Sequence, residues 1–301
     1  MDASEDSLFQ LTTDECERLM LHSSSSLSID RPCTLGDGIE WWDKTQLNDW
    51  ILKWQESPLS PSECSLWIPA SGAATRMFSP LLSDPVVQTK MYDNVDHFAF
   101  GKAWREAVSR EFDSWESASP KQSSKLLWSM MDDGQLPKAL VPFHIDPDSK
   151  QIETACLSHI RMWSEVMKEG GDVFFTVQSS KRVLMASHLA EVKGGNFQFH
   201  FPEQDPNTDL PVLGEDGCWM RNVEGQLLRR PGGHGALLPL LEKVQTRFVV
   251  IRNIDNAPSP GMRHERVEWT CAMIAAARDW AKERDEAIHR LQREESDLPE
   301  V

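Results

Sequence analysis

Residues 172–201, DVFFTVQSSKRVLMASHLAEVKGGNFQFHF, contain a strand, a helix and a second strand in succession. Every residue from Val173 to Val177 is β-branched or aromatic, and glycines precede the run, which predicts a buried strand. Residues 181–192 then predict a helix, and residues 196–201 predict the next strand. This order is typical of a parallel sheet covered by helices.

The same alternation extends to both sides of this unit. Short apolar runs predict strands at residues 65–68 and 247–252, and residues 212–230 predict a hairpin. Further helices are predicted at residues 84–131, with a break near 117–124, and at residues 153–168 and 235–244. We therefore expect an α/β fold with a mostly parallel sheet flanked by helices, in which ligands bind beyond the carboxyl ends of the strands.

Three parts are expected along the chain. Residues 1–60 form a helical N-terminal accessory segment, which contains an amphipathic helix between Trp41 and Gln55. Residues 61–262 form the α/β core. Residues 263–301 form a C-terminal helix and tail with alternating charges and an apolar stripe. This helix either packs on its own domain with a solvated face or joins copies of the chain in a homo-oligomer.

Composition limits the partners of the chain. It has 301 residues and a formal net charge of −16. A field of this sign repels nucleic acid and anionic membranes, so neither is expected as a partner. The apolar runs are too short to span a bilayer, the start is acidic and unlike a signal peptide, and the cysteines show no metal or disulfide pattern. We expect a cytoplasmic protein.

Two segments predict phosphate contacts. Residues 69–77, PASGAATRM, form a loop of small residues after a predicted strand and include Arg76. Small residues let backbone N–H groups approach phosphate oxygens, and an arginine adds a fork of donors, although many strand–helix turns use the same residues. Residues 136–143, LPKALVPF, place Lys138 among prolines and apolar residues, which favours a buried stem and a directed ammonium group. A surface lysine beside a turn is the alternative.

Two further segments predict a ligand pocket and a metal anchor. Residues 231–235, PGGHG, place three glycines around His234 before a predicted helix, which favours close approach of a ligand over a tight hairpin exit. Residues 253–256, NIDN, set Asp255 at the carboxyl end of a buried strand. Mg²⁺ needs only one or two carboxylates besides substrate phosphates, so Asp255 is either a magnesium ligand or a turn cap.

Taken together and in this order, the four segments resemble motifs of sugar-1-phosphate nucleotidyltransferases. Residues 71–77 are similar to the nucleotide loop, and residues 137–142 to the Pro-Lys signature. Residues 231–235 and 253–256 resemble motifs of eukaryotic-type UDP-glucose and UDP-N-acetylhexosamine pyrophosphorylases, and residues 201–204, FPEQ, the strand end that holds a glutamine against uracil. The chain is identified as a member of a bacterial domain-of-unknown-function family with this pattern, over about residues 65–257.

The resemblance implies a Rossmann-like GT-A fold that binds a nucleoside triphosphate, with UTP favoured, together with Mg²⁺. The triphosphate backbone is then held by Ser71, Gly72, Ala73, Ala74 and Thr75. The implied catalytic residues are Arg76 at the β- and γ-phosphates, Lys138 at the α-phosphate and Asp255 on the metal. The implied contacts to the rest of the nucleotide come from Gln204, Gly232, Gly233 and His234.

The expected reaction joins the nucleotidyl group to a phosphorylated small molecule such as a sugar 1-phosphate and releases pyrophosphate. Only about 45 residues follow Asp255, so the acceptor pocket must come from the N-terminal segment, residues 84–131 or a partner chain, or else the chain is a reduced version of the fold. Two alternatives stay open. One is a GT-A glycosyltransferase that consumes a nucleotide sugar, and the other is a non-catalytic nucleotide-binding protein.

Overall fold

The computed structural model describes residues 30–190, 192, 195–214, 217–230 and 232–296. Residues 1–29 of the expected accessory segment, the tail from residue 297 and Pro231 of the glycine-rich motif lie outside this part. The chain divides into two compact units, residues 1–46 and 47–301. In the first unit, β1 (Thr34–Leu35) and β2 (Gly38–Ile39) form a short parallel pair. The expected N-terminal helix is α2 (Lys44–Glu56), most of which belongs to the second unit.

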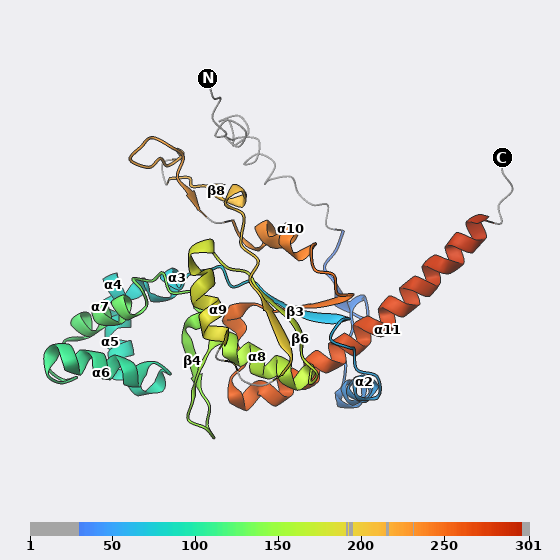
Figure 1. The fold of residues 1–301 in the computed structure, drawn as a ribbon, viewed down its shortest axis with the longest axis horizontal. Helices are drawn as coiled ribbons and strands as arrows, with labels where there is room; N and C mark the ends of the chain where they lie inside the picture. Colours follow the sequence, from blue (N-terminus) through green and yellow to red (C-terminus); the bar gives the residue numbers. More distant parts are fainter. Residues whose placement is uncertain (1–29, 191, 193–194, 215–216, 231, 297–301) are drawn as a thin grey trace. The chain divides into compact units, whose positions relative to one another are not determined.

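A four-stranded parallel sheet forms the centre of the second unit (Figure 1). Its members are β3 (Cys64–Ile68), β6 (Gly171–Phe175), β7 (Phe197–His200) and β10 (Phe248–Ile251), in the order β10-β3-β6-β7. All three pairings are parallel. The predicted α/β class and the four predicted strands are therefore confirmed.

One face of this sheet packs on helices. Side chains alternate between the two faces of a strand, and Leu66, Ile68, Val173 and Phe175 share the face on which all four are 0% exposed. They form one apolar cluster with residues of three helices, α8 (Ala155–Val166), α9 (Arg182–Ala190) and α11 (Arg263–Ser296). These helices confirm the predictions at residues 153–168 and 181–192 and that of a C-terminal helix.

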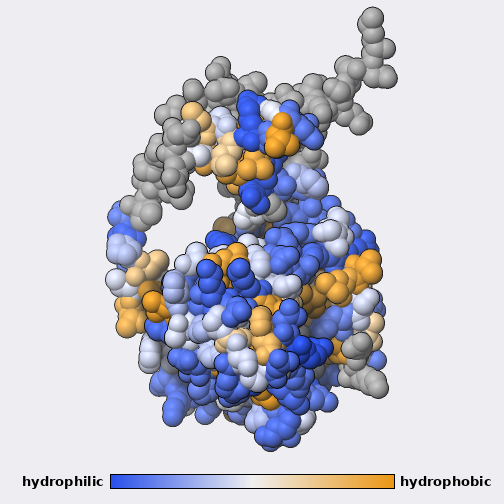
Figure 2. All heavy atoms as spheres, turned by 90° about the vertical axis from the view of Figure 1, so that its left-hand side faces the viewer, coloured by the Kyte–Doolittle hydropathy of each residue, from blue (hydrophilic) through white to orange (hydrophobic). Residues whose placement is uncertain are grey.

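A second apolar cluster is built from the segment between β3 and residue 131, together with Val141. The helices of this segment are α3 (Thr75–Phe78), α4 (Pro80–Ser83), α5 (Pro85–Asp93), α6 (Gly101–Phe112) and α7 (Pro120–Met130). Asp84 caps α5, and Ser119 and Gln122 form a capping box on α7. The helical run predicted at residues 84–131 thus begins at the Asp84 cap, and the break predicted near residues 117–124 is confirmed at Ser119. A further interruption, at residues 94–100, separates α5 from α6. The outer surface of this segment is largely hydrophilic (Figure 2).

The remaining elements are short. Two antiparallel pairs are β4 (Pro142–Ile145) with β5 (Ile152–Thr154), and β8 (Leu210–Pro211) with β9 (Arg229–Arg230). The second pair closes the predicted hairpin region. The helix predicted at residues 235–244 is η6 (His234–Leu237) followed by α10 (Leu238–Leu241), and it ends early. The other 3-10 turns are η2 (Val95–His97), η3 (Lys138–Leu140), η4 (Ser179–Lys181), η5 (Pro206–Thr208), η7 (Ile254–Asn256) and η8 (Pro260–Met262).

Candidate membrane spans were sought among the helices of the described residues. None of these helices combines the length and the apolar character that crossing a bilayer requires.

Candidate functional site

The loop that follows β3 is fixed at the carboxyl edge of the sheet. The backbone N–H of Ala70 donates to Thr176 Oγ1 at 3.0 Å, and Gln178 Nε2 donates to the Ser71 carbonyl at 2.9 Å. Both partners follow β6, the neighbouring strand. The predicted phosphate loop therefore lies where ligands bind in parallel sheets.

The lysine segment pairs with this loop. The N–H of Ala74 donates to the Leu136 carbonyl at 2.9 Å, and the N–H of Lys138 donates to the Gly72 carbonyl at 3.1 Å. Ala73 and Pro137 form a bridge between these two bonds. The first two motifs, separated by about sixty residues in sequence, are thus held together by the backbone.

Lys138 reaches the fourth motif. Its Nζ lies 2.9 Å from Asp255 Oδ2, and the two side chains are 18% and 39% exposed. Asp255 lies in η7, directly after β10, and its N–H donates to Asn253 Oδ1 at 3.2 Å. The turn cap is therefore Asn253, which leaves the Asp255 carboxylate free to contact Lys138.

Gln204 joins the loop after β3 to the glycine-rich motif. Its Oε1 accepts a hydrogen bond from Ser71 Oγ at 3.0 Å, and its Nε2 donates to the Gly232 carbonyl at 3.3 Å. The side chain is buried. In this arrangement both ends of the amide are occupied within the protein, so Gln204 acts as a brace between two segments of the site.

The glycines of the site fall into two groups. At Gly232 a Cβ would lie 2.6 Å from the Thr208 carbonyl oxygen, so packing requires glycine there. Around Gly72, Gly233 and Gly235 a Cβ would meet nothing within 4 Å, and none of the three has a positive φ. Since neither packing nor conformation among the described residues explains these glycines, their backbone is open to approach by a ligand.

Thr75, Arg76 and His234 are among the predicted site residues whose side chains make no hydrogen bond or ion pair with Lys138 or Asp255. Thr75 Oγ1 donates to the Gly134 carbonyl at 2.7 Å, away from the pair. Arg76 is exposed in α3, and its guanidinium has no hydrogen-bond or ion-pair partner among the described residues. The exposed His234 side chain likewise has none within the described part of the chain.

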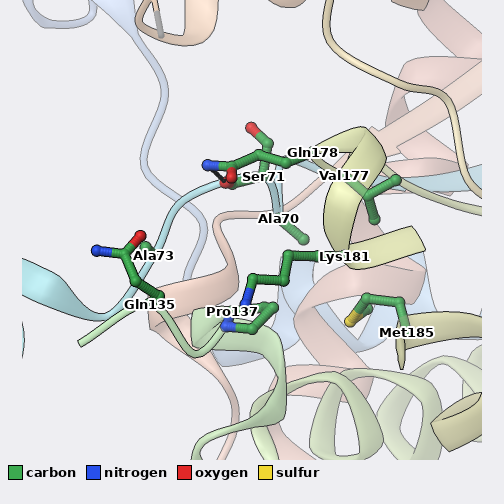
Figure 3. A pocket seen from close by; sticks show the side chains of 9 residues that line it. All are labelled: Ala70, Ser71, Ala73, Gln135, Pro137, Val177, Gln178, Lys181 and Met185. Atoms are coloured by element: carbon green, nitrogen blue, oxygen red, sulfur yellow. Dashed lines mark hydrogen bonds between the residues drawn. The ribbon is translucent and has the colours of Figure 1, made fainter. Parts of the chain in front are cut away.

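A small pocket beside the loop contains residues that the sequence analysis did not single out (Figure 3). Gln178 and Lys181 enter it from the segment after β6, and Gln135 and Pro137 form part of its wall. Lys181 Nζ lies 2.6 Å from Asp132 Oδ2. Gln178 and Lys181 could have been found in the sequence because they follow the carboxyl end of a predicted strand, the same position that singled out Asp255.

A buried histidine supports the turn that carries Asp255. His159 of α8 donates from Nε2 to the Ile254 carbonyl at 3.4 Å. Burial lowers the pKa of His159 to about 4, and the positive charge of Arg252 acts in the same direction. The imidazole is therefore neutral near pH 7, and it packs against the turn that contains Asp255.

The donor set limits how a metal ion could bind. Among the described residues no group of three or more His, Cys, Asp or Glu side chains could hold a metal ion. Asp255 is a single carboxylate, and only one of its oxygens contacts Lys138. A lone carboxylate fits Mg²⁺ only if the phosphates of a bound substrate supply further oxygen ligands.

Fold and site together define a parallel α/β protein with a polar site at the strand ends. The chain belongs to the family described as a domain of unknown function (DUF4301), whose model matches residues 12–301. A comparison with curated proteins found no match.

Proposed function

We propose that this chain is a nucleotidyltransferase of GT-A type that transfers the nucleotidyl group of a nucleoside triphosphate, with UTP favoured, to a phosphorylated small molecule such as a sugar 1-phosphate. An oxygen of the acceptor phosphate attacks the α-phosphorus, the bond to the β-phosphate oxygen breaks, and pyrophosphate leaves. Because both reactants are anions, the task is alignment and neutralisation of charge.

The contact that supports this proposal most strongly is the ion pair between Lys138 and Asp255. It joins residues 117 positions apart at the edge of the sheet, beside the backbone of Gly72. Before substrate binds, each group neutralises the other. In the proposed complex Asp255 would hold the Mg²⁺ that accompanies the triphosphate, and Lys138 would then be free to contact the α-phosphate.

Two further features support phosphate binding. The open backbone around Gly72 and Gly233 allows close approach of phosphate oxygens. Arg76 stands at the end of the loop with no carboxylate partner among the described residues, although the chain has 47 acidic and 31 basic residues. An unpaired arginine in so acidic a chain is available for the β- and γ-phosphates. Mg²⁺ would add charge neutralisation at the same place.

The test is pyrophosphate release from UTP with a panel of sugar 1-phosphates. Lys138→Met and Asp255→Asn should each lower the rate by about 10²–10³-fold, as removal of comparable electrostatic groups does. Lys102→Met, on the exposed face of α6, is the matched control and should keep the parent rate. Parent-like rates in both site variants would refute the proposal. Release of a nucleoside diphosphate from a nucleotide sugar, without pyrophosphate, would instead support a glycosyltransferase.

A further inference from the structure

A second hollow, of about 350 Å³, is lined by neither Lys138 nor Asp255. Its lining includes Trp67 of β3, Phe174 of β6 and His200 of β7, and it is closed on another side by Leu240 and Val244 from α10 and the residues after it. Neighbouring residues of a strand point to opposite faces of the sheet, and Phe175 belongs to the buried apolar cluster. Phe174, and with it the hollow, therefore lies on the opposite face. Its volume and its apolar lining are typical of a small-molecule site.

Three rings form a stack across this face. Strand pairing places Trp67 beside Phe174 and Phe174 beside His200. The ring centroids are 5.6 Å apart in the first pair and 4.5 Å apart in the second, and both pairs are stacked. Because β7 is an edge strand, no further strand of the sheet continues the stack beyond His200, whose side chain is 41% exposed.

The orientation of the terminal ring is held by a carboxylate. His200 Nε2 donates to Asp172 Oδ1 at 2.7 Å, and Asp172 lies two residues before Phe174 on the same face of β6. The imidazole is thus fixed at the end of the stack before any ligand arrives. A preorganised ring loses little conformational entropy when another planar ring stacks on it.

The charged residues of the lining are all basic. Arg182 and Lys243 line the hollow and, within the described part of the chain, no Asp or Glu does, although the chain has 47 acidic and 31 basic residues. Arg182 is paired with Glu203 at 2.9 Å, whereas the ammonium group of Lys243 has no partner among the described residues. The hollow therefore combines a stacking surface with a free positive charge.

We propose that this hollow binds a planar aromatic or heteroaromatic ring that carries a negatively charged group. The ring extends the stack at His200, and the anion pairs with Lys243. This chemistry is shared by the base and phosphate of a nucleotide and by a free aromatic carboxylate. The proposal stands apart from catalysis at Lys138 and Asp255, because it rests on other residues.

The experiment is isothermal titration of the full chain with uridine 5′-monophosphate and, separately, with indole-3-acetate. Inorganic phosphate is the probe that lacks a ring. We expect one of the two ring compounds to bind, which identifies the source of the ring, and phosphate alone not to compete with it. Binding must also persist in the Lys138→Met background, which separates this site from the proposed catalytic one.

Variants then test the assigned contacts. His200→Ala should weaken binding about tenfold through loss of stacking, and Lys243→Ala should weaken it several-fold and reduce its salt dependence. His200→Phe keeps a ring but loses the hydrogen bond to Asp172, so it should bind more weakly than the parent and more tightly than His200→Ala, and Lys102→Ala is the charge control on α6. Folding of each variant is checked by its thermal unfolding midpoint.

Several outcomes would overturn the proposal. These are no binding of either ring compound up to millimolar concentration, equal competition by phosphate alone, parent-like binding in both alanine variants, or loss of binding in a folded His200→Phe variant.

Discussion

The two faces of the central sheet differ in what covers them. On one face, aliphatic and aromatic side chains such as Leu66 and Phe175 are wholly buried by α8, α9 and α11. On the other face, Trp67, Phe174 and His200 form a row of rings beside a hollow; Trp67 is buried, whereas Phe174 and His200 are partly exposed. Parallel sheets are usually buried on both faces. The difference indicates that the first face supplies stability, whereas the second leaves room for a ligand.

The largest expected effect on stability comes from replacing, one at a time, two neighbouring phenylalanines that lie on opposite faces of the sheet. Phe175→Ala removes a wholly buried ring and should lower the free energy of unfolding by about 3–5 kcal/mol, measured by urea denaturation. Phe174→Ala removes a half-buried ring and should cost less than half of that. Phe175→Leu, a milder change, covers the case in which the alanine variant does not fold. Equal losses in the free energy of unfolding at positions 174 and 175 would contradict the proposed difference between the two faces.

A buried carboxylate on the helical side should give the next largest effect. Glu153 is 0% exposed, and its oxygens lie 2.5 Å from Arg161 Nη1 and 2.8 Å from Arg263 Nη2, which links β5, α8 and α11. Glu153→Gln leaves Arg263 without its carboxylate and leaves Arg161 with Asp146 alone, at 3.2 Å, and should lower the free energy of unfolding by about 3 kcal/mol. Asp96→Asn serves as the control, because it breaks an exposed ion pair with Arg105. Its free energy of unfolding in urea should equal that of the parent.

Buried His159 predicts how stability depends on pH. Its folded-state pKa of about 4 lies below that of an unfolded histidine, near 6.5, so the unfolded state takes up a proton first as the pH falls. The stability that the neutral His159 provides is therefore fully present above pH 6.5, and it is lost as the pH falls from 6.5 to 4. Between pH 7 and 5 His159 should account for about 2 kcal/mol of lost stability.

Urea denaturation at these two pH values, compared between the parent and His159→Gln, isolates this contribution. The difference between pH 7 and pH 5 should shrink by about 2 kcal/mol in the variant. His234→Ala changes an exposed histidine and should retain the parent difference. An unchanged difference in His159→Gln would show that the buried imidazole does not titrate as its burial requires.

The smallest stability effect is expected at the brace between the site segments. Gln204→Leu removes the hydrogen bonds to Ser71 and Gly232 and should cost about 1–2 kcal/mol in urea denaturation. If Gln204 is only a brace, Ser71→Ala should be nearly as costly, and the double variant should cost much less than the sum. Additive losses would show that the two side chains act independently.

Sequence periodicity was sufficient to locate the strands along the chain but insufficient to predict which strands lie side by side in the sheet. Each of the four runs is short and contains at least two β-branched or aromatic residues, so its conformation follows from local patterning. The order β10-β3-β6-β7 sets the last strand beside the first, which local patterning does not encode. Within residues 84–131 the break near Ser119 was predicted from local sequence, whereas the interruption at residues 94–100, between α5 and α6, was not.

The candidate site shows the same division between sequence and structure. Composition and position in the strand–loop–helix pattern were enough to single out Lys138, Asp255 and the glycine motifs. Only the tertiary structure set the Lys138 ammonium 2.9 Å from Asp255, closed both ends of the Gln204 amide and brought Trp67, Phe174 and His200 into one stack. The reason is physical: a residue's local preference depends on its neighbours in sequence, whereas these contacts depend on strand register and on chain crossovers that bring together residues 26 to 133 positions apart.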